Sequence, residues 1–201
     1  MRQNTYENLE KHLRILWLQR REQPLFKEAA IQLGELLARE GIRLVYGGGS
    51  IGLMGALAKT VLQNGGEVTG VIPDFLKEQE VMLEEAHELI VTQDMHERKR
   101  TMFEKADAFI ALPGGIGTLE ELVEMLTWAQ LGRHDKPMLL LNLGQFWTPL
   151  VELLDHMRDL GFIHPDRDIN YEITEDVSQS VDILCRAIEG CKIENPDLNA
   201  M

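Results

Sequence analysis

The segment Pro113–Glu121 combines residue types that bind a phosphate group and act on a neighbouring bond. It reads PGGIGTLEE and directly follows the apolar run Ala108–Leu112. Three glycines within four residues let the backbone fold closely over an anion, and a helix predicted from Thr118 would direct its first N–H groups and the Thr118 hydroxyl at the same point. This pattern is typical of a phosphate-binding loop.

Glu121 has two interpretations. Thr118 and Glu121 have the spacing of a capping box, in which the glutamate side chain accepts a hydrogen bond from the backbone N–H of Thr118. A carboxylate beside a bound phosphate is otherwise unfavourable, unless it stabilises a cation or activates water. The spacing alone leaves both interpretations open.

A second candidate is the start of the helix predicted over Met95–Lys105. Asp94 and Glu97 have the spacing of an N-cap and its box partner. Positive charges then crowd the second turn, against the helix dipole, so the pattern favours an anion supplied from elsewhere. The alternative is a solvated basic face. The three cations are Arg98, Lys99 and Arg100.

The stretch Gly47–Gly52, GGGSIG, follows a predicted strand and fits the pattern GxGxxG. Its glycines, Gly48, Gly49 and Gly52, could bring the backbone close to a phosphate or nucleotide at a helix N-terminus. The alternative is a tight strand-to-helix turn that needs glycine for close packing. Asp74 follows the next strand roughly where a ribose-binding acid would lie, which keeps a dinucleotide-dependent oxidoreductase open.

Charge and composition exclude several classes of protein. The 201 residues include 33 acidic and 20 basic ones, a net charge of −13, which opposes binding to nucleic acid or an anionic membrane. No apolar run approaches the roughly 18 residues of a membrane span. Cys185 and Cys191 lack metal-ligand spacing, so we expect no metal and a cytoplasmic location.

Short apolar runs alternate with amphipathic helical stretches along the chain. Such alternation requires crossover connections and therefore predicts an α/β fold, a mostly parallel sheet with helices on both faces. We expect one nucleotide-binding domain over residues 1–201, with loosely ordered tails at 1–11 and 191–201. Strands are predicted at 42–46, 68–72, 89–92, 108–112 and 137–142, and helices at 24–40, 53–63, 95–105, 118–131, 146–160 and 177–190.

Two glycine loops, a cationic helix start and a glutamate suit a nucleoside monophosphate as ligand. Cleavage of its N-glycosidic bond passes through an oxocarbenium-like transition state, which a carboxylate can stabilise while cations hold the phosphate. The residues alone therefore suit a nucleoside monophosphate and are compatible with cleavage of this bond.

These motifs resemble the LOG (lonely guy) family, cytokinin riboside 5'-monophosphate phosphoribohydrolases often labelled lysine decarboxylases. The resemblance runs from about Pro24 to Gly161 and includes YGGGSIGLMG, GVIP, DMHERK, ADAFIALPGGIGTLEEL, TWAQLG and HDKP. It implies a Rossmann-like, cytoplasmic homodimer that hydrolyses a nucleoside 5'-monophosphate, such as a cytokinin riboside monophosphate or AMP, to free base and ribose 5-phosphate without a cofactor.

The resemblance also implies roles for individual residues. Arg98 and Glu121 match the catalytic pair, with Glu121 stabilising the ribosyl cation or aligning water and Arg98 holding substrate. The positions that match substrate contacts are Glu80, Lys99, Gly114, Gly115, Ile116, Gly117, Thr118 and Thr127.

One segment departs from the family pattern. Members usually have a short loop of small residues after the first strand, whereas this chain reads LWLQRR over Leu16–Arg21. The departure keeps a catalytically silent nucleotide-binding module as an alternative. Lysine decarboxylation, the third alternative, would need a Schiff-base lysine with pyridoxal phosphate.

The apolar pattern of the helix predicted after the PGGIGT loop is also consistent with a dimer. Its apolar residues nearly encircle the helix, so more than one of its faces should be buried. These residues are Leu122, Val123, Met125, Leu126, Trp128 and Ala129.

Overall fold

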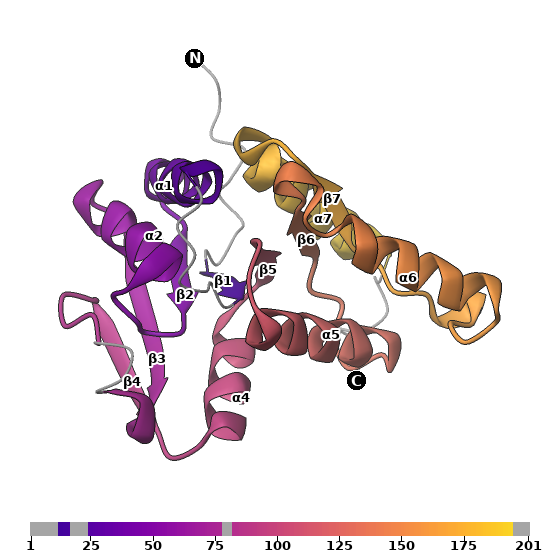
Figure 1. Cartoon of the computed structure of the whole chain (residues 1–201), viewed down its shortest axis with the longest axis horizontal. Coiled ribbons are helices and arrows are strands. Elements are labelled where there is room, and N and C mark those ends of the chain that lie inside the picture. The colour runs from indigo at the N-terminus through magenta and orange to yellow at the C-terminus, as the bar shows by residue number, and fades with distance from the viewer. Residues whose placement is uncertain (1–11, 17–23, 78–81, 195–201) are drawn as a thin grey trace.

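Seven parallel strands form a single sheet at the centre of the molecule (Figure 1). The computed structural model describes residues 12–16, 24–77 and 82–194. The strand order is β4-β3-β2-β1-β5-β6-β7, and all six ladders are parallel. The strands are β1 (His12–Leu16), β2 (Arg43–Tyr46), β3 (Val68–Pro73), β4 (Glu88–Thr92), β5 (Ala108–Ala111), β6 (Met138–Leu141) and β7 (Glu172–Thr174).

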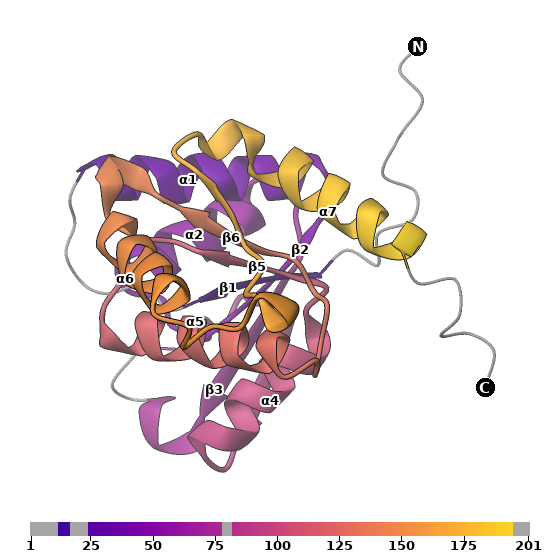
Figure 2. The same ribbon diagram turned by 90° about the vertical axis from the view of Figure 1, so that its right-hand side faces the viewer.

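Helices cover both faces of this sheet because successive strand residues are apolar on both sides. Leu44 and Tyr46 of β2 pack with one helical layer, whereas Val45 between them packs with the other. Figure 2 shows α1 and α7 above the strands and α4 and α5 below them. The helices are α1 (Pro24–Arg39), α2 (Gly52–Gln63), α4 (Met95–Lys105), α5 (Ile116–Gln130), α6 (Thr148–Asp159) and α7 (Ser180–Glu194).

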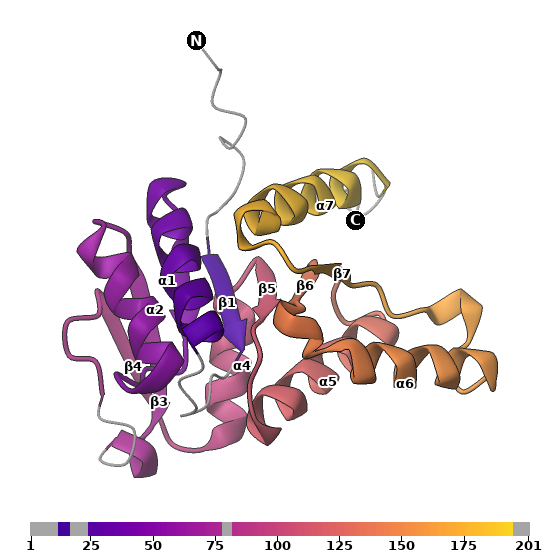
Figure 3. The ribbon, with the colours of Figure 1, turned by 45° about the horizontal axis from the view of Figure 1, so that its top comes forward.

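The order of the strands reverses between β1 and β5. From β1 the chain moves outward to β4, then returns through α4 to place β5 on the opposite side of β1 (Figure 3). Leu16 and Ala111 are register partners at the carboxyl ends of these two strands. In doubly wound sheets, ligands bind at the carboxyl ends beside such a reversal. The PGGIGT loop begins at this point.

The predicted elements are present with small shifts in their ends. The helix over Met95–Lys105 has the predicted bounds, while α5 begins at Ile116 instead of Thr118. The short strand β7 was not predicted. The helix α7 begins at Ser180, after a 3-10 turn, and continues to Glu194, four residues into the expected tail. Residues 1–11 and 195–201 lie outside the described residues.

None of the helices in the described part of the chain is long and apolar enough to cross a membrane.

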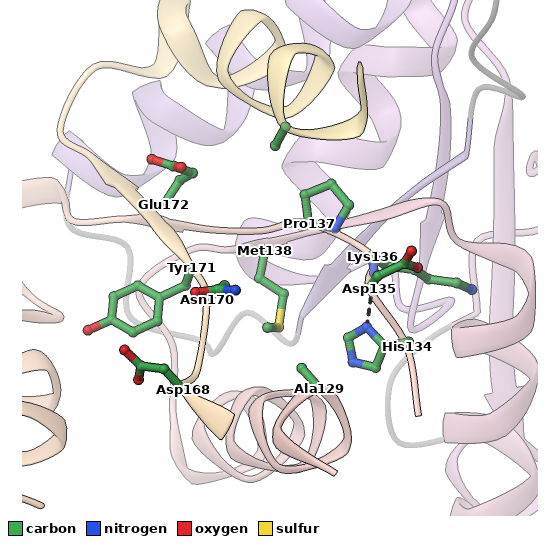
Figure 4. Close-up of a pocket in the computed structure, with 11 residues that line it drawn as sticks. Ala129, His134, Asp135, Lys136, Pro137, Met138, Asp168, Asn170, Tyr171 and Glu172 are labelled. Carbon is green, nitrogen blue, oxygen red and sulfur yellow. Dashed lines mark hydrogen bonds between the residues drawn. The ribbon is translucent and has the colours of Figure 1, made fainter. Parts of the chain in front are cut away.

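A cavity of about 240 Å³ lies at the amino ends of β6 and β7, opposite the glycine loops (Figure 4). His134 lies at its edge and joins three elements. Nε2 of the ring lies 3.0 Å from the carbonyl oxygen of Met125, and Nδ1 accepts a hydrogen bond from the backbone N–H of Lys136 at 3.2 Å. The ring also packs edge-on against Phe103 and Phe109. Burial lowers the pKa of His134, so the neutral ring is the folded form.

We predict that this histidine makes stability fall as the pH is lowered. The folded pKa is below that of the unfolded chain, about 6.5, so the unfolded state binds the proton more tightly. Its contribution to stability is therefore complete above about pH 6.5 and is lost as the pH falls toward the folded pKa. Urea unfolding of wild type and His134→Gln between pH 7.5 and 5 checks this.

The matched control is His156→Gln, because His156 is exposed on α6. Wild type and the control should lose stability over this range, whereas His134→Gln should lose less. Equal pH dependence in all three proteins would contradict the prediction.

Candidate active site

The first turn of α4 is fixed by the predicted capping interactions. Asp94 is the N-cap, and its Oδ1 accepts a hydrogen bond from the backbone N–H of Glu97 at 2.8 Å. Glu97 in turn accepts from the backbone N–H of Gln93 at 2.6 Å, one residue earlier than in an ideal box. The pair fixes the rotation of the helix, and this rotation directs Arg98 toward the sheet.

Arg98 is completely buried at the carboxyl edge of the sheet. Its Nε donates to the carbonyl oxygen of Val71 in β3 at 3.1 Å, and its Nη2 donates to that of Gly47, just after β2, at 3.2 Å. Nη1 lies 3.7 Å from the sulfur of Met95. The solvated basic face is therefore the wrong interpretation for Arg98 and Lys99, which are both buried, although Arg100 is exposed.

The first glycine loop packs closely against its surroundings. A Cβ atom on Gly47 would lie 2.1 Å from Nη2 of Arg98, so only glycine leaves room for the guanidinium. Gly48 has a φ of 82° and its carbonyl accepts from the backbone N–H of Leu83, while Gly49 forms a bridge with Met82. The helix α2 starts at Gly52. Close packing around Arg98 therefore explains the glycine at position 47, and a positive φ close to Ile72 explains the glycine at position 48.

Glu121 lies on the inner face of α5. It is 1% exposed and shares this face with Thr118, Leu122 and Met125. The N-cap of α5 is Gly115, so Thr118 is already inside the first turn and does not form the capping box with Glu121. The capping interpretation of Glu121 is therefore wrong, and its chemical role stays a prediction.

Lys99 connects the two helices that carry Arg98 and Glu121. Its amine donates to Glu120 at 2.7 Å and to Glu124 at 3.2 Å, both on α5. Burial disfavours its charge, but the two carboxylates outweigh burial and raise the pKa of Lys99. This bridge ties α4 to α5 on the same face of the sheet (Figure 2).

The N-terminus of α5 has the properties of an anion site. Its N-cap is a glycine, so no side chain caps the first N–H groups of a 15-residue helix. Gly114, Gly115 and Gly117 are partly exposed, and Ile116 is 79% exposed. The backbone here can be reached by a ligand within the first turns of the helix that carries Glu121.

One other predicted contact lies elsewhere. Thr127 is exposed on the outer face of α5, where its hydroxyl donates to the carbonyl of Val123 at 2.7 Å. Glu80 and residues 17–21 of the atypical segment lie outside the described residues.

Sequence reasoning did not predict the carboxylate partners of Lys99 or the carbonyl partners of Arg98. The available signal for the partners of Lys99 was the spacing of Glu120 and Glu124, four residues apart on one helix. The available signal for the partners of Arg98 was the glycine at position 47, which leaves space for a large side chain.

Within the described ranges, no three His, Cys, Asp or Glu side chains gather closely enough to hold a metal ion.

Solved structures share the fold. The molybdenum cofactor carrier protein from Chlamydomonas reinhardtii is similar with a TM-score of 0.67 and 20% identity, over 90% of this chain and 99% of that one. A molybdenum cofactor binding protein from Rippkaea orientalis gives a TM-score of 0.65 at 22% identity, with the same coverage of both chains. At these identities the likeness shows the Rossmann-like fold alone.

Sequence relatives are much closer. A probable cytokinin riboside 5'-monophosphate phosphoribohydrolase of Oryza sativa subsp. japonica is 54% identical over 142 residues, which cover 71% of this chain and 64% of that protein. A cytokinin riboside 5'-monophosphate phosphoribohydrolase of Arabidopsis thaliana is 51% identical over 144 residues, 72% of this chain and 66% of that protein. The matched segments thus span slightly less than two thirds of these relatives.

A family model described as "Possible lysine decarboxylase" matches residues 54–184, from α2 into α7. This range contains the buried arginine, the PGGIGT loop and the buried glutamate. With half of the aligned residues identical to named LOG proteins, the chain belongs to the LOG family.

Proposed function

We propose that this protein hydrolyses the N-glycosidic bond of a nucleoside 5'-monophosphate and releases the free base and ribose 5-phosphate. The observation that carries the proposal is the burial of Glu121 on the same helix whose uncapped N-terminus follows the glycine loop. The activity printed for the relatives supports the same reaction, with a cytokinin riboside monophosphate as substrate and AMP as the alternative.

The phosphate would bind at the N-terminus of α5. Backbone N–H groups of the Gly114–Thr118 segment point toward the start of the helix, and the helix dipole favours a dianion there. Arg98, buried nearby on α4, adds a cation that does not depend on pH in the physiological range. Together these groups would hold the ribose phosphate against the inner face of α5.

Glu121 would then act at the anomeric carbon of the ribose. The bond from C1' to the base nitrogen breaks with its electron pair going to the base, and positive charge develops on the ribose. A buried carboxylate stabilises such charge strongly because little water screens it. It can also accept a proton from the attacking water, whose oxygen bonds to C1' while the departing base takes up a proton.

Lysine decarboxylation is not supported by the surroundings of Lys99. A Schiff-base lysine must lose its proton to act as a nucleophile. The two carboxylates that contact Lys99 favour its charged form and raise its pKa.

The oxidoreductase alternative loses its two supporting features. Asp74 is exposed and forms an ion pair with Lys77 at 2.6 Å. Gly47 is accounted for by packing around Arg98 and Gly48 by its positive φ beside Ile72, so neither of these glycines needs a dinucleotide.

A homodimer along α5 is part of the proposal. The outer face of α5 forms an apolar groove lined by Ile116, Leu119, Glu120, Val123, Glu124, Thr127 and Trp128. Two copies of this helix packed antiparallel and centred on Val123 would place Thr127 of one copy opposite Leu119 of the other. Thr127 would then lie one helical turn from the Gly115 of the second copy. This arrangement gives Thr127 a place at the substrate although it faces away from Glu121 in its own chain.

We also propose that the protein acts in the cytoplasm as a single nucleotide-binding domain. Its two cysteines lack the pattern of a disulfide framework, and its negative charge disfavours nucleic-acid or membrane partners.

We expect Glu121→Gln to reduce base release from isopentenyl-AMP and AMP by at least about a thousandfold, because the amide cannot stabilise positive charge or accept a proton. Chromatographic detection of the free base measures this. Binding of ribose 5-phosphate should be retained.

The matched control for this variant is Glu104→Gln, an exposed glutamate on α4 that should retain full activity. Wild-type protein that binds AMP but releases no base would instead support the silent nucleotide-binding module.

Gly47→Ala tests whether activity depends on the position of the Arg98 guanidinium. The new methyl group would overlap Nη2 of the guanidinium, so the side chain must move. We expect a loss of about a hundredfold in kcat/KM, comparable to removing one oriented catalytic hydrogen-bond donor. Circular dichroism should show a folded protein, because the backbone at position 47 does not require a positive φ.

Gly65→Ala is the control, since a Cβ atom there meets no atom within 4 Å. It should retain the wild-type kcat/KM despite the strain of its positive φ. Equal activities of the two variants would contradict the proposed role of Gly47.

Val123→Asp tests the dimer. A charge at the centre of the α5 groove should lower the molar mass in light scattering from twice 22.9 kDa to 22.9 kDa. Base release should fall at least about tenfold, since the partner's Thr127 would be lost.

Leu153→Asp, on the exposed face of α6, is the control and should remain a dimer. A monomeric wild type at micromolar concentration would overturn this part of the proposal.

A further inference from the structure

The turn that follows β6 is built in an unusual conformation. Gly144 and Gln145 both have a positive φ, 58° and 59°, and Gln145 is the one non-glycine residue with a positive φ in the described part of the chain. Left-handed backbone at a residue with a side chain costs free energy and persists where the surroundings enforce it. The contacts of the neighbouring residues must therefore hold this turn in its conformation.

Asn142 holds this turn together. Its Oδ1 accepts the backbone N–H of Trp147 at 2.7 Å, and its Nδ2 donates to the hydroxyl of Thr148 at 3.1 Å. Its own backbone N–H donates to the carbonyl of Thr174, which extends the ladder with β7. The buried amide thereby ties the start of α6 to the end of β6, and it fixes the place of Trp147.

Trp147 contacts the strand that leads into the phosphate loop. Its side chain is 3% exposed, and its indole Nε1–H donates to the carbonyl oxygen of Ala111 at 3.2 Å. Ala111 is the last residue of β5, and Pro113 and Gly114 follow two and three residues later. The ring of Phe146 packs edge-on against the indole at 4.9 Å, which limits its movement.

The hydrogen bond lies at the last ladder position of β5. Ala111 pairs with Leu140, and β6 ends one residue later, before the turn at Asn142. In this register the carbonyl of Ala111 faces β6, so the indole is a second donor to an oxygen that the ladder already engages. The peptide that joins Ala111 to Leu112 is therefore held both by β6 and by Trp147, and this peptide sets the direction in which the loop leaves the sheet.

We propose that Trp147 is a positioning residue for the phosphate loop, with Asn142 and the left-handed turn holding the indole in place. The inference rests on the proposed function in taking the ligand of the loop to be a phosphate monoester. Trp147 acts through Ala111 and does not touch substrate. It adjusts the spacing between the glycine N–H groups and the start of α5, which determines how well they fit a phosphate.

The experiment compares Trp147→Phe, Asn142→Ala and the double variant. Phenylalanine keeps an aromatic ring but removes the indole N–H. Each single variant should raise KM for AMP by roughly five- to tenfold, the effect of one hydrogen bond of ordinary strength, with kcat changed less than about twofold. The KM of the double variant should be no higher than that of the more impaired single variant, because both substitutions break the same connection between Asn142, Trp147 and Ala111.

Leu154→Ala is the matched control for lost stability. Leu154 belongs to the same apolar cluster as Trp147, and its truncation destabilises α6 without removing the indole donor. All proteins are also titrated calorimetrically with ribose 5-phosphate and with inorganic phosphate. The Kd of both ligands should increase in Trp147→Phe and stay at the wild-type value in Leu154→Ala.

The calorimetric measurement separates this inference from the proposed function. A wild type that releases no base would refute the hydrolase, yet weaker phosphate binding by Trp147→Phe would still support the positioning role. If Trp147→Phe loses stability as Leu154→Ala does while its KM and both Kd values stay unchanged, Trp147 is a packing residue and the inference is overturned.

Discussion

The structure depends on the burial of one guanidinium at the carboxyl edge of the sheet. Removing Arg98 from water carries a large desolvation cost, which is offset when its donors meet acceptors in the interior. Two of these acceptors are the backbone carbonyls of Val71, within β3, and of Gly47, just after β2. The absence of a side chain at Gly47, the tight path of the first glycine loop and the capped start of α4 all serve this arrangement. The residue that would hold substrate thus also holds three elements together.

A second buried cation sets the spacing of the two helices below the sheet. Lys99 lies beside Arg98 but faces α5, where Glu120 and Glu124 accept its hydrogen bonds. Two adjacent positive charges can be buried because one is met by backbone carbonyls and the other by carboxylates. The two adjacent glutamates therefore have different surroundings. Glu120 forms an ion pair with Lys99, whereas Glu121 faces the sheet.

The fold could be predicted from sequence, because periodicity and glycine-rich junctions are local features, whereas the roles of the site residues stay a prediction. Alternation of strands and helices predicted the parallel sheet, and the spacing of Asp94 and Glu97 predicted the capped helix. The capping box at Thr118 was wrong because glycine at position 115 starts α5 earlier, which no spacing rule settles. The strand β7 escaped prediction since its three residues, Glu172–Thr174, show too short a pattern. The burial of Arg98 and the contact of Trp147 with β5 depend on tertiary packing, which local patterns do not encode.

The reversal of strand order between β1 and β5 has a consequence for how the protein folds. Their ladder joins residues almost a hundred positions apart, including the pair Leu16 and Ala111. Closing such a loop costs chain entropy before the contacts repay it, so this pairing belongs to the slow, late stage of folding. The ends of β2 and β3 must be in place before Arg98 can meet its carbonyl acceptors, and β5 must be in place before the PGGIGT loop can leave the sheet. A nascent or partly folded chain therefore lacks the buried arrangement around Arg98, which forms together with closure of the sheet.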